Sequence, residues 1–221
     1  IMINVLPGFC GNTLALVHST ITATVPVNTT GYSLGYLFRI TNLSTNQTRY
    51  LPRSIRNFNL LMTDIADYNT TYSVAVAAII NGEEQTVYGS ECLITTPPIP
   101  TTRLVKCVEG GTTLAVMSSS ISCLSVNLAT AYKFKVALAS NPSVFTEIVR
   151  TTQGFQMTML DSSFPLLFDT EYLVQVKVRI SAANAAVEVY GDYGDTCIVK
   201  TPLGPEIFIV GCVDPSITPA S

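Results

Sequence analysis

The chain has little of the material from which catalytic and metal sites are built. Its 221 residues include no tryptophan and one histidine, His18, and charged residues make up 12% of the total. That share is about half of the roughly 25% that is typical of soluble domains. Acid–base catalysis and zinc binding draw on histidine, carboxylates and closely spaced cysteines. The sequence contains no Cys-x-x-Cys motif, no paired acids and no nucleophile–base set. We therefore expect neither enzymatic activity nor a cofactor.

An excess of basic charge and long apolar runs are missing as well. The net charge of −3 and the pI near 5.1 leave no basic surface for nucleic acid. No apolar run approaches the 18 residues that indicate a membrane span. Threonine, in contrast, is abundant at 28 residues. We expect threonine and asparagine side chains to supply much of the polar, hydrated surface.

An internal repeat is the most informative feature of the sequence. Residues 88–97 and 193–202 both fit the pattern Tyr-Gly-x-x-Cys-[Leu/Ile]-[Ile/Val]-x-Thr-Pro. Four further anchors recur in the same order: Cys10 with Cys107, Tyr36 with Tyr132, Phe58 with Phe155, and Tyr72 with Tyr172.

The repeat defines the predicted domains. We expect a first repeat over 1–98 and a second over 99–203, with 204–221 as the start of a third repeat or a trimmed tail. Proline-rich joins at 97–100 and 202–205 separate them. Because such segments are semi-rigid spacers, the array is expected to be extended.

Strict alternation of apolar and polar residues dominates both repeats. It occurs at 21–25, 36–40 and 72–77 in the first repeat, and at 132–136 and 172–178 in the second. Alternation of this kind predicts half-buried strands. With about seven short strands per repeat, the chain is predicted to be all-β, with two tandem β-sandwich domains of the fibronectin type III or immunoglobulin kind.

The segments around Tyr72 and Tyr172 resemble a known family. Residues 60–76 and 167–176 are similar to the fibronectin type III pattern Leu-x(3–5)-Thr-x-Tyr-x-Val-x-Val, which joins strands E and F. The resemblance implies that both tyrosines form the tyrosine corner, whose hydroxyl bonds back to the chain. Two features depart from the family: its usual strand-B tryptophan is replaced near Ala23 and Cys123, and the paired cysteines are additional.

The cysteines, the Tyr-Gly-x-x-Cys ending and the proline-rich joins resemble a narrower group. They are similar to the tandem fibronectin type III-like repeats of large Bacteroidota cell-surface proteins, such as the type IX secreted gliding-motility adhesins of the SprB type. This resemblance covers nearly the whole chain. It implies an extracellular, cell-surface location.

In an exported protein, the cysteines are expected to form disulfides. Within each repeat, the pairs would be Cys10–Cys92 and Cys107–Cys197. Across repeats, they would be Cys92–Cys107 and Cys197–Cys212, and the constant 15-residue spacing suits both schemes. We favour the first scheme, because an extended linker would carry the next cysteine beyond the ~7 Å Cα limit. Cys123 is then an unpaired, buried thiol, and Cys212 is free or pairs outside this chain.

Four Asn-x-Ser/Thr sequons are candidate glycosylation sites, and all of them lie in the first repeat. They begin at Asn28, Asn42, Asn46 and Asn69.

These observations favour a structural or adhesive segment of an extracellular filament or giant surface adhesin. The alternative is a spacer or glycan-binding accessory module of a secreted glycan-degrading enzyme. The expected partners are neighbouring repeats of the same or identical chains and surface glycans. Nucleic acid and a membrane span are not expected.

Overall fold

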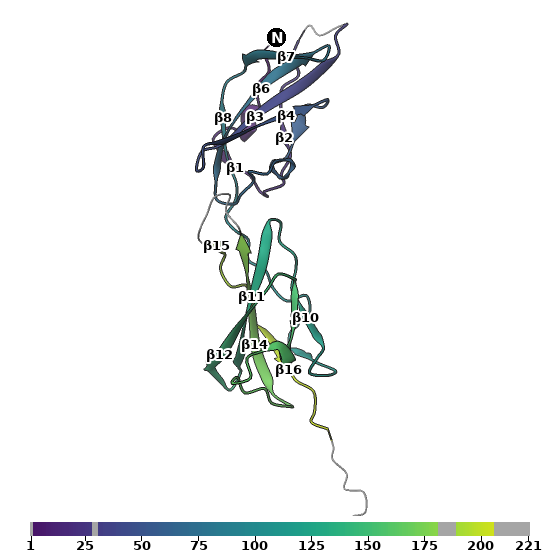
Figure 1. The fold of residues 1–221 in the computed structure, drawn as a ribbon, viewed down its shortest axis with the longest axis vertical. Helices are drawn as coiled ribbons and strands as arrows, with labels where there is room; N and C mark the ends of the chain where they lie inside the picture. The colour runs from purple at the N-terminus through teal and green to yellow at the C-terminus, as the bar shows by residue number, and fades with distance from the viewer. Residues whose placement is uncertain (1, 28–30, 181–188, 206–221) are drawn as a thin grey trace, which may run out of the picture.

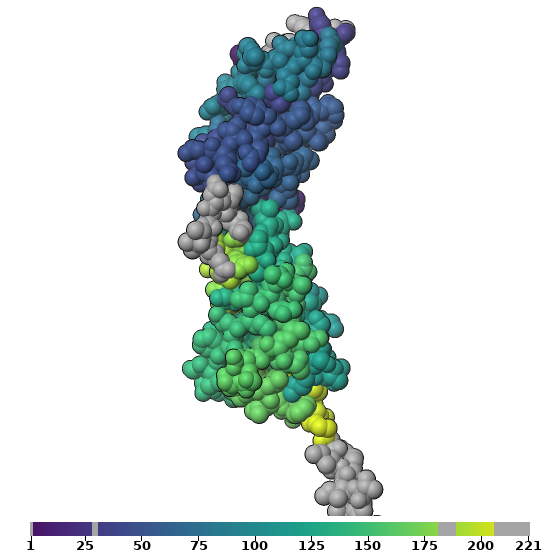
Figure 2. Space-filling view, viewed as in Figure 1, coloured from purple at the N-terminus to yellow at the C-terminus, as the bar shows by residue number. Residues whose placement is uncertain are grey.

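The computed structural model describes residues 2–27, 31–180 and 189–205. Two all-β bodies lie end to end along the long axis of the molecule, the first in purple to blue and the second in teal to green (Figure 1). The space-filling view has the same elongated outline, with the two bodies in contact at their facing ends (Figure 2). The chain is therefore an extended pair of β-sandwiches, as the sequence predicted.

The first sandwich has a large sheet of six strands and a small sheet of two. The large sheet runs in the order β1-β8-β6-β3-β4, with β7 also on β6, and β2 pairs with β5 in the small sheet. Strand β1 runs parallel to β8, and the other pairs are antiparallel. The elements are η1 (Pro7–Phe9), β1 (Asn12–Thr13), β2 (Ile21–Thr22), β3 (Leu34–Asn42), β4 (Gln47–Arg53), β5 (Asn57–Phe58), η2 (Leu60–Met62), β6 (Thr71–Ile80), β7 (Glu83–Tyr88) and β8 (Cys92–Thr95).

The second sandwich repeats this plan. Its large sheet has the order β12-β11-β14-β16-β9, with β15 also on β14, and β10 pairs with β13 in the small sheet. Strand β9 again runs parallel to the last strand. The elements are β9 (Thr112–Thr113), β10 (Ser120–Ser122), β11 (Ala129–Leu138), β12 (Asn141–Arg150), β13 (Gly154–Gln156), η3 (Met157–Met159), β14 (Glu171–Ile180), β15 (Val189–Tyr190) and β16 (Cys197–Lys200).

Alternating residues of the large sheets fill the cores. On β14, every second residue from Tyr172 to Ile180 is buried and the residues between are partly exposed. The two sheets meet through aromatic pairs at matching places: the Phe38 and Phe58 ring centroids are 4.5 Å apart, and those of Phe134 and Phe155 are 4.7 Å apart. The anchors Phe58 and Phe155 thus occupy matching places in two equivalent cores.

Strand β6 departs from the expected alternation, because both of its faces are buried. Ala75 and Ala77 point away from the core, yet they are 1% and 0% exposed. They lie opposite Arg39 and Leu37 on β3, and Ala77 also lies opposite Tyr88 on β7. The flanking side chains are long and cover the short alanines.

The glycine of the repeated Tyr-Gly-x-x-Cys motif has a steric role that the sequence did not reveal. Ile3 forms an antiparallel bridge with Val76, and the start of the chain passes directly over Gly89. A Cβ atom at Gly89 would collide with the carbonyl oxygen of Ile3, and one at Gly194 would collide with that of Thr102. Each glycine therefore makes room for the first segment of its own repeat.

Candidate functional site

The facing ends of the two sandwiches form a packed junction, which we take as the candidate functional site. Residues 15–18 and Tyr68 approach it from the first sandwich, and residues 124–127 approach it from the second. Val17 and Tyr68 are 2% and 7% exposed, and both belong to the apolar cluster of the second sandwich. These two side chains thus join the core of the next repeat.

Hydrogen bonds fix the contact between the sandwiches. The Tyr68 hydroxyl donates to the backbone carbonyl of Asn127 at 3.1 Å, and the Asn127 side-chain amide lies 3.0 Å from Nδ1 of His18. Burial raises the pKa of Tyr68, so its hydroxyl remains a donor at neutral pH. His18, which the sequence left as a lone histidine, is therefore part of the joint.

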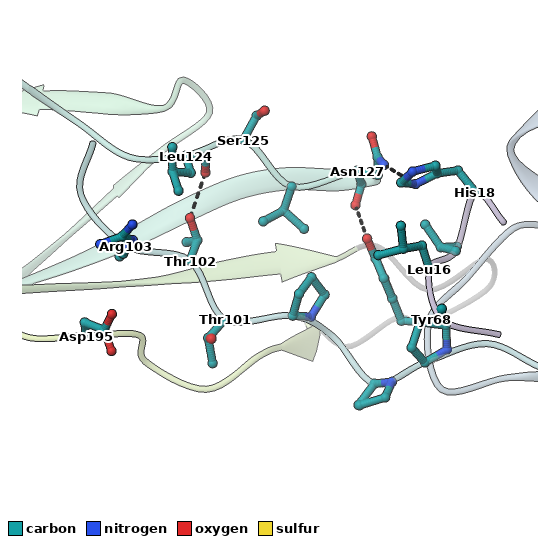
Figure 3. Close-up of a pocket in the computed structure, with 16 residues that line it drawn as sticks. Leu16, His18, Tyr68, Thr101, Thr102, Arg103, Leu124, Ser125, Asn127 and Asp195 are labelled. Carbon is teal, nitrogen blue, oxygen red and sulfur yellow. Dashed lines mark hydrogen bonds between the residues drawn. The ribbon is translucent and has the colours of Figure 1, made fainter. Parts of the chain in front are cut away.

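A cavity of about 480 Å³ opens beside this contact. His18 and Tyr68 lie at one end of it, and Arg103 and Asp195 lie at the other (Figure 3). Thr102 lines the cavity between these ends, and its hydroxyl donates a hydrogen bond to the carbonyl of Leu124 at 2.7 Å. The hydrogen bonds around the cavity connect one loop to another, which suits a mechanical joint between the sandwiches.

Metal chemistry has no visible site in the described part of the chain. Within residues 2–27, 31–180 and 189–205, no group of three or more His, Cys, Asp or Glu side chains is placed to hold a metal ion. Over the same residues, no helix has both the length and the apolar character needed to cross a membrane.

Both predicted tyrosine corners have the expected geometry. The Tyr72 hydroxyl donates to the carbonyl of Ile65 and accepts from the backbone N–H of Asp67, both at 2.8 Å. The Tyr172 hydroxyl donates to the carbonyl of Pro165 at 2.7 Å and accepts from the N–H of Leu167 at 2.8 Å. Burial raises the pKa of both tyrosines, because the ionised phenolate is poorly solvated there.

The cysteines pair within each repeat in this structure. Cys10 is bonded to Cys92 and Cys107 to Cys197, with Cα–Cα distances of 4.9 Å and 5.2 Å. The cross-repeat scheme is therefore not adopted by these four residues. Each bond ties the segment before the first strand to the first residue of the last strand of its sandwich.

Cys123 is a free, buried thiol, 2% exposed, beside the start of its repeat. It bridges Leu104, just as Ala23 bridges Val5 in the first sandwich. Burial raises its pKa to about 11. The other cysteine expected to lack a partner in this chain, Cys212, lies outside the described residues.

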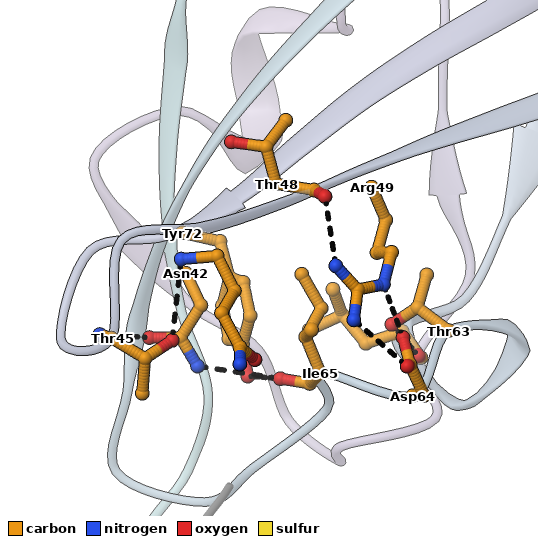
Figure 4. A network of polar contacts seen from close by, with 10 residues as sticks. Asn42, Thr45, Thr48, Arg49, Thr63, Asp64, Ile65 and Tyr72 are labelled. Carbon is orange, nitrogen blue, oxygen red and sulfur yellow. Dashed lines mark hydrogen bonds and ion pairs between the residues drawn. The ribbon is translucent and has the colours of Figure 1, made fainter. Parts of the chain in front are cut away.

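The structure speaks against a glycan at Asn42, one of the candidate glycosylation sites, because that side chain is 1% exposed. Its amide donates to the carbonyl of Ile65 at 3.3 Å, and its oxygen accepts from the backbone N–H groups of Ser44 and Thr45 (Figure 4). Asn42 therefore caps the turn after β3, and its nitrogen is inaccessible to a glycan.

Two of the other sequons differ from Asn42, because their asparagines are exposed. Asn46 and Asn69 are exposed and occupy left-handed turn positions, with φ values of 56° and 49°. They remain candidate acceptors. Asn28 lies outside the described residues.

Two threonines with a structural role escaped the sequence analysis. Thr96 and Thr201, of the repeated Thr-Pro ending, are 1% and 0% exposed. Each hydroxyl accepts from the backbone N–H of the equivalent residue before β6 or β14, Thr70 or Thr170, at 3.0 Å. The recurrence of Thr-Pro in both repeats was the available signal. Its effect is to fix the last strand immediately before the linker.

No protein-family model matches the chain, and no curated protein matches it. Among solved structures, the FN1–FN3 domains of chicken CNTN1 match at 16% identity and a TM-score of 0.35, over 91% of this chain and 67% of that one. The chicken interferon gamma receptor alpha chain matches at 9% identity and a TM-score of 0.38, over 85% of this chain and 93% of that one. The strand order and tyrosine corners described above identify the fold of this chain as a pair of fibronectin type III-like β-sandwiches.

Proposed function

We propose that the chain is a structural and adhesive segment of an extracellular filament or large cell-surface adhesin, made of sandwiches joined end to end. The observation that carries this proposal is the position of the disulfides. Cys10–Cys92 and Cys107–Cys197 connect residues near the two ends of each repeat, at sequence separations of 82 and 90.

This arrangement offers a covalent path for tension along the molecule. A pull on the ends passes from Cys10 to Cys92, through the linker to Cys107, and then to Cys197. Residues 11–91 and 108–196 lie inside the disulfide loops and bear no tension. Each disulfide also lowers the entropy of the unfolded chain. In the chain-entropy model, this stabilises the folded sandwich by about 4–5 kcal/mol for loops of this length.

The junction supports the same proposal, because it limits bending between the sandwiches. Val17 and Tyr68 insert into the second core, and the linker contains three prolines in residues 97–100. A packed contact beside a stiff linker favours a rod over two freely jointed beads.

The far end of the second sandwich repeats the surface that makes the junction. Phe168 and Met117 occupy the positions of Tyr68 and Val17, and local bonds such as that from the N–H of Val116 to Ser119 Oγ recur. Phe168 is 48% exposed, whereas Tyr68 is 7% exposed. This end is therefore suited to receive a further sandwich of the same kind.

Single-molecule pulling on the two ends of the chain tests the proposal. In the oxidised protein, unfolding should release little length. After reduction, the two sandwiches should release about 280 Å and about 300 Å more, at ~3.4 Å per enclosed residue. Equal extensions in both states would refute the tension path. The Cys92→Ser and Cys197→Ser variants should each release only one of the two additional lengths without reductant.

A spacer or accessory module beside a glycan-degrading enzyme is the second candidate. The basic, aromatic face described below would serve it equally well. The sequence of the parent gene separates the two, because a long array supports the adhesin and a hydrolase domain supports the accessory module.

A further inference from the structure

The outer face of the large sheet in the second sandwich gathers lysines against aromatic rings. The Lys133 ammonium on β11 lies 4.8 Å from the ring centroid of Tyr190, and the Lys177 ammonium on β14 lies 5.1 Å from the same ring. Lys177 is also 4.5 Å from the ring of Tyr193. On the neighbouring edge, Lys135 lies 4.4 Å from the ring of Phe145, a side chain that is 50% exposed. We call these six side chains the lysine–aromatic face.

Of the residues that the structure describes, Glu147 is the one carboxylate in ion-pair contact with the three lysines of this face. Glu147 lies 3.4 Å from Lys133 and accepts a hydrogen bond from the Tyr193 hydroxyl at 2.6 Å. That hydrogen bond and Lys133 lower the pKa of Glu147, so it is ionised at neutral pH. Lys133 and Lys177 lie directly opposite each other on adjacent strands. Like charges in such a pair are destabilising. The face therefore carries an electrostatic cost that a bound anion would remove.

The first sandwich demonstrates that the fold does not require these lysines. Its equivalent cross-strand pair is Leu37 and Ala77, which are 4% and 0% exposed. Its one cation on this face with a matching ring contact, Arg39, lies 4.6 Å from the Tyr88 ring and is paired with Glu91 at 3.1 Å. The same backbone arrangement is thus built with a neutral apolar pair in one repeat and two ammonium groups in the other.

We infer that the lysine–aromatic face binds an anionic polysaccharide, with carboxylate or sulfate groups on the lysines and sugar rings against the aromatic side chains. Strand geometry places the Cα atoms of Lys133 and Lys135 about 7 Å apart along β11, and the Cβ atom of Lys177 on β14 about 5 Å from that of Lys133. A row of partly exposed ammonium groups on the outer face of a sheet suits a linear polyanion. The exposed Phe145 ring beside Lys135 adds an apolar surface for a sugar ring, which an acidic peptide does not need. This inference specifies the adhesive part of the proposed function.

Binding of defined polymers to the intact oxidised chain tests the inference. Isothermal titration calorimetry would compare polygalacturonate, dextran sulfate, neutral dextran and poly-glutamate. We expect binding to one or both charged polysaccharides, weakened about tenfold between 50 and 200 mM salt, and no binding to neutral dextran. A preference for polygalacturonate or for dextran sulfate distinguishes carboxylate from sulfate recognition. Absence of binding to both charged polysaccharides, or equally tight binding of poly-glutamate, would overturn the inference.

The test variant replaces each lysine by the residue that the first sandwich uses at the same position, Lys133→Leu with Lys177→Ala. Because the equivalent sheet of the first sandwich accommodates a leucine–alanine pair at this position, the variant should fold. An unchanged far-UV spectrum and a melting temperature within a few degrees of the unmodified chain would show this. Its affinity for the charged polysaccharide should fall about tenfold. Lys106→Ala removes an exposed lysine outside the face and should leave affinity within twofold. An equal loss in both variants would overturn the inference.

The pulling experiment separates this inference from the tension path. The Lys133→Leu/Lys177→Ala variant should keep the extension of the unmodified chain. A protein that binds polyanion but extends fully without reductant would refute the tension path and leave the binding site standing.

Discussion

The hydroxyl of Tyr68, in the first sandwich, donates a hydrogen bond to the backbone carbonyl of Asn127, in the second, at 3.1 Å. The ring is 7% exposed and packs in the second core. One side chain thus provides an apolar and a polar contact across the junction, beside those of Val17 and His18.

Replacing Tyr68 should loosen the rod without unfolding either sandwich. In Tyr68→Ala, the packing and the hydrogen bond are both lost, and the distribution of shapes in small-angle scattering should broaden toward bent conformations. Tyr68→Phe keeps the ring and should keep most of the rod. Identical scattering from Tyr68→Ala and the unmodified chain would mean that the prolines alone set the geometry.

Removing a tyrosine-corner hydroxyl should destabilise the sandwich that contains it. In Tyr72→Phe, the buried N–H of Asp67 loses its partner, so we expect the free energy of unfolding to fall by about 1–3 kcal/mol. Chemical denaturation under oxidising conditions measures it. Tyr50→Phe is a matched control, because Tyr50 is 61% exposed and its loss should cost under ~0.5 kcal/mol. Equal effects of the two substitutions would contradict the role of the corner.

Cys123 should be protected from thiol reagents in the folded protein. Burial raises its pKa to about 11, so at pH 8 the thiol is both protonated and covered. In a Cys212→Ser background, we expect slow labelling of the native chain and labelling of one thiol after denaturation. Rapid native labelling would contradict the burial of this residue.

The same pKa gives a pH dependence with a defined sign. The folded state holds the Cys123 proton more tightly than the unfolded state, so this stabilising contribution is complete below the ordinary thiol pKa. It is lost as the pH rises from about 9 to about 11. The stability of the unmodified chain relative to Cys123→Ala should therefore decrease over that window.

The motif glycine should tolerate no side chain. Gly89→Ala places a Cβ against the carbonyl oxygen of Ile3, and the backbone must shift to admit it. We expect a loss of about 3 kcal/mol in the free energy of unfolding. Gly8→Ala is the control, because nothing lies within 4 Å of a Cβ at that position. A Gly89→Ala protein as stable as Gly8→Ala would contradict the close passage of the first segment.

The sequence predicted the features that depend on periodicity and on local pattern. Alternation at residues 132–136 and 172–178 predicted two strands of the second sheet. The resemblance of the segments around Tyr72 and Tyr172 to the fibronectin type III pattern implied hydrogen bonds that the structure places at these two tyrosines. These are properties of one strand or one turn, which the order of residues encodes directly.

The features that were missed depend on residues far apart in the chain. Tyr68 and Asn127 are 59 residues apart, and nothing in either segment marks them as partners. Lys133 and Lys177 form a pair only in the register of β11 with β14. The burial of the candidate site Asn42 has a similar origin, because the Ile65 carbonyl that accepts a hydrogen bond from its amide comes from another loop.

The exposed far end of the second sandwich should bind the near end of another copy weakly. At that near end, Val25 and Val27, which occupy positions close to those of residues 125–127, are 59% and 81% exposed. The linker supplies an effective concentration in the millimolar range, so the same contact between separate chains is expected to form only at protein concentrations of that order. Sedimentation at about 1 mM protein should therefore reveal elongated, concentration-dependent oligomers. Phe168→Ser should abolish these oligomers, whereas Phe145→Ser, which changes the lysine–aromatic face, should not. Oligomers that persist in Phe168→Ser would place the contact elsewhere and remove the argument that this end receives a further sandwich.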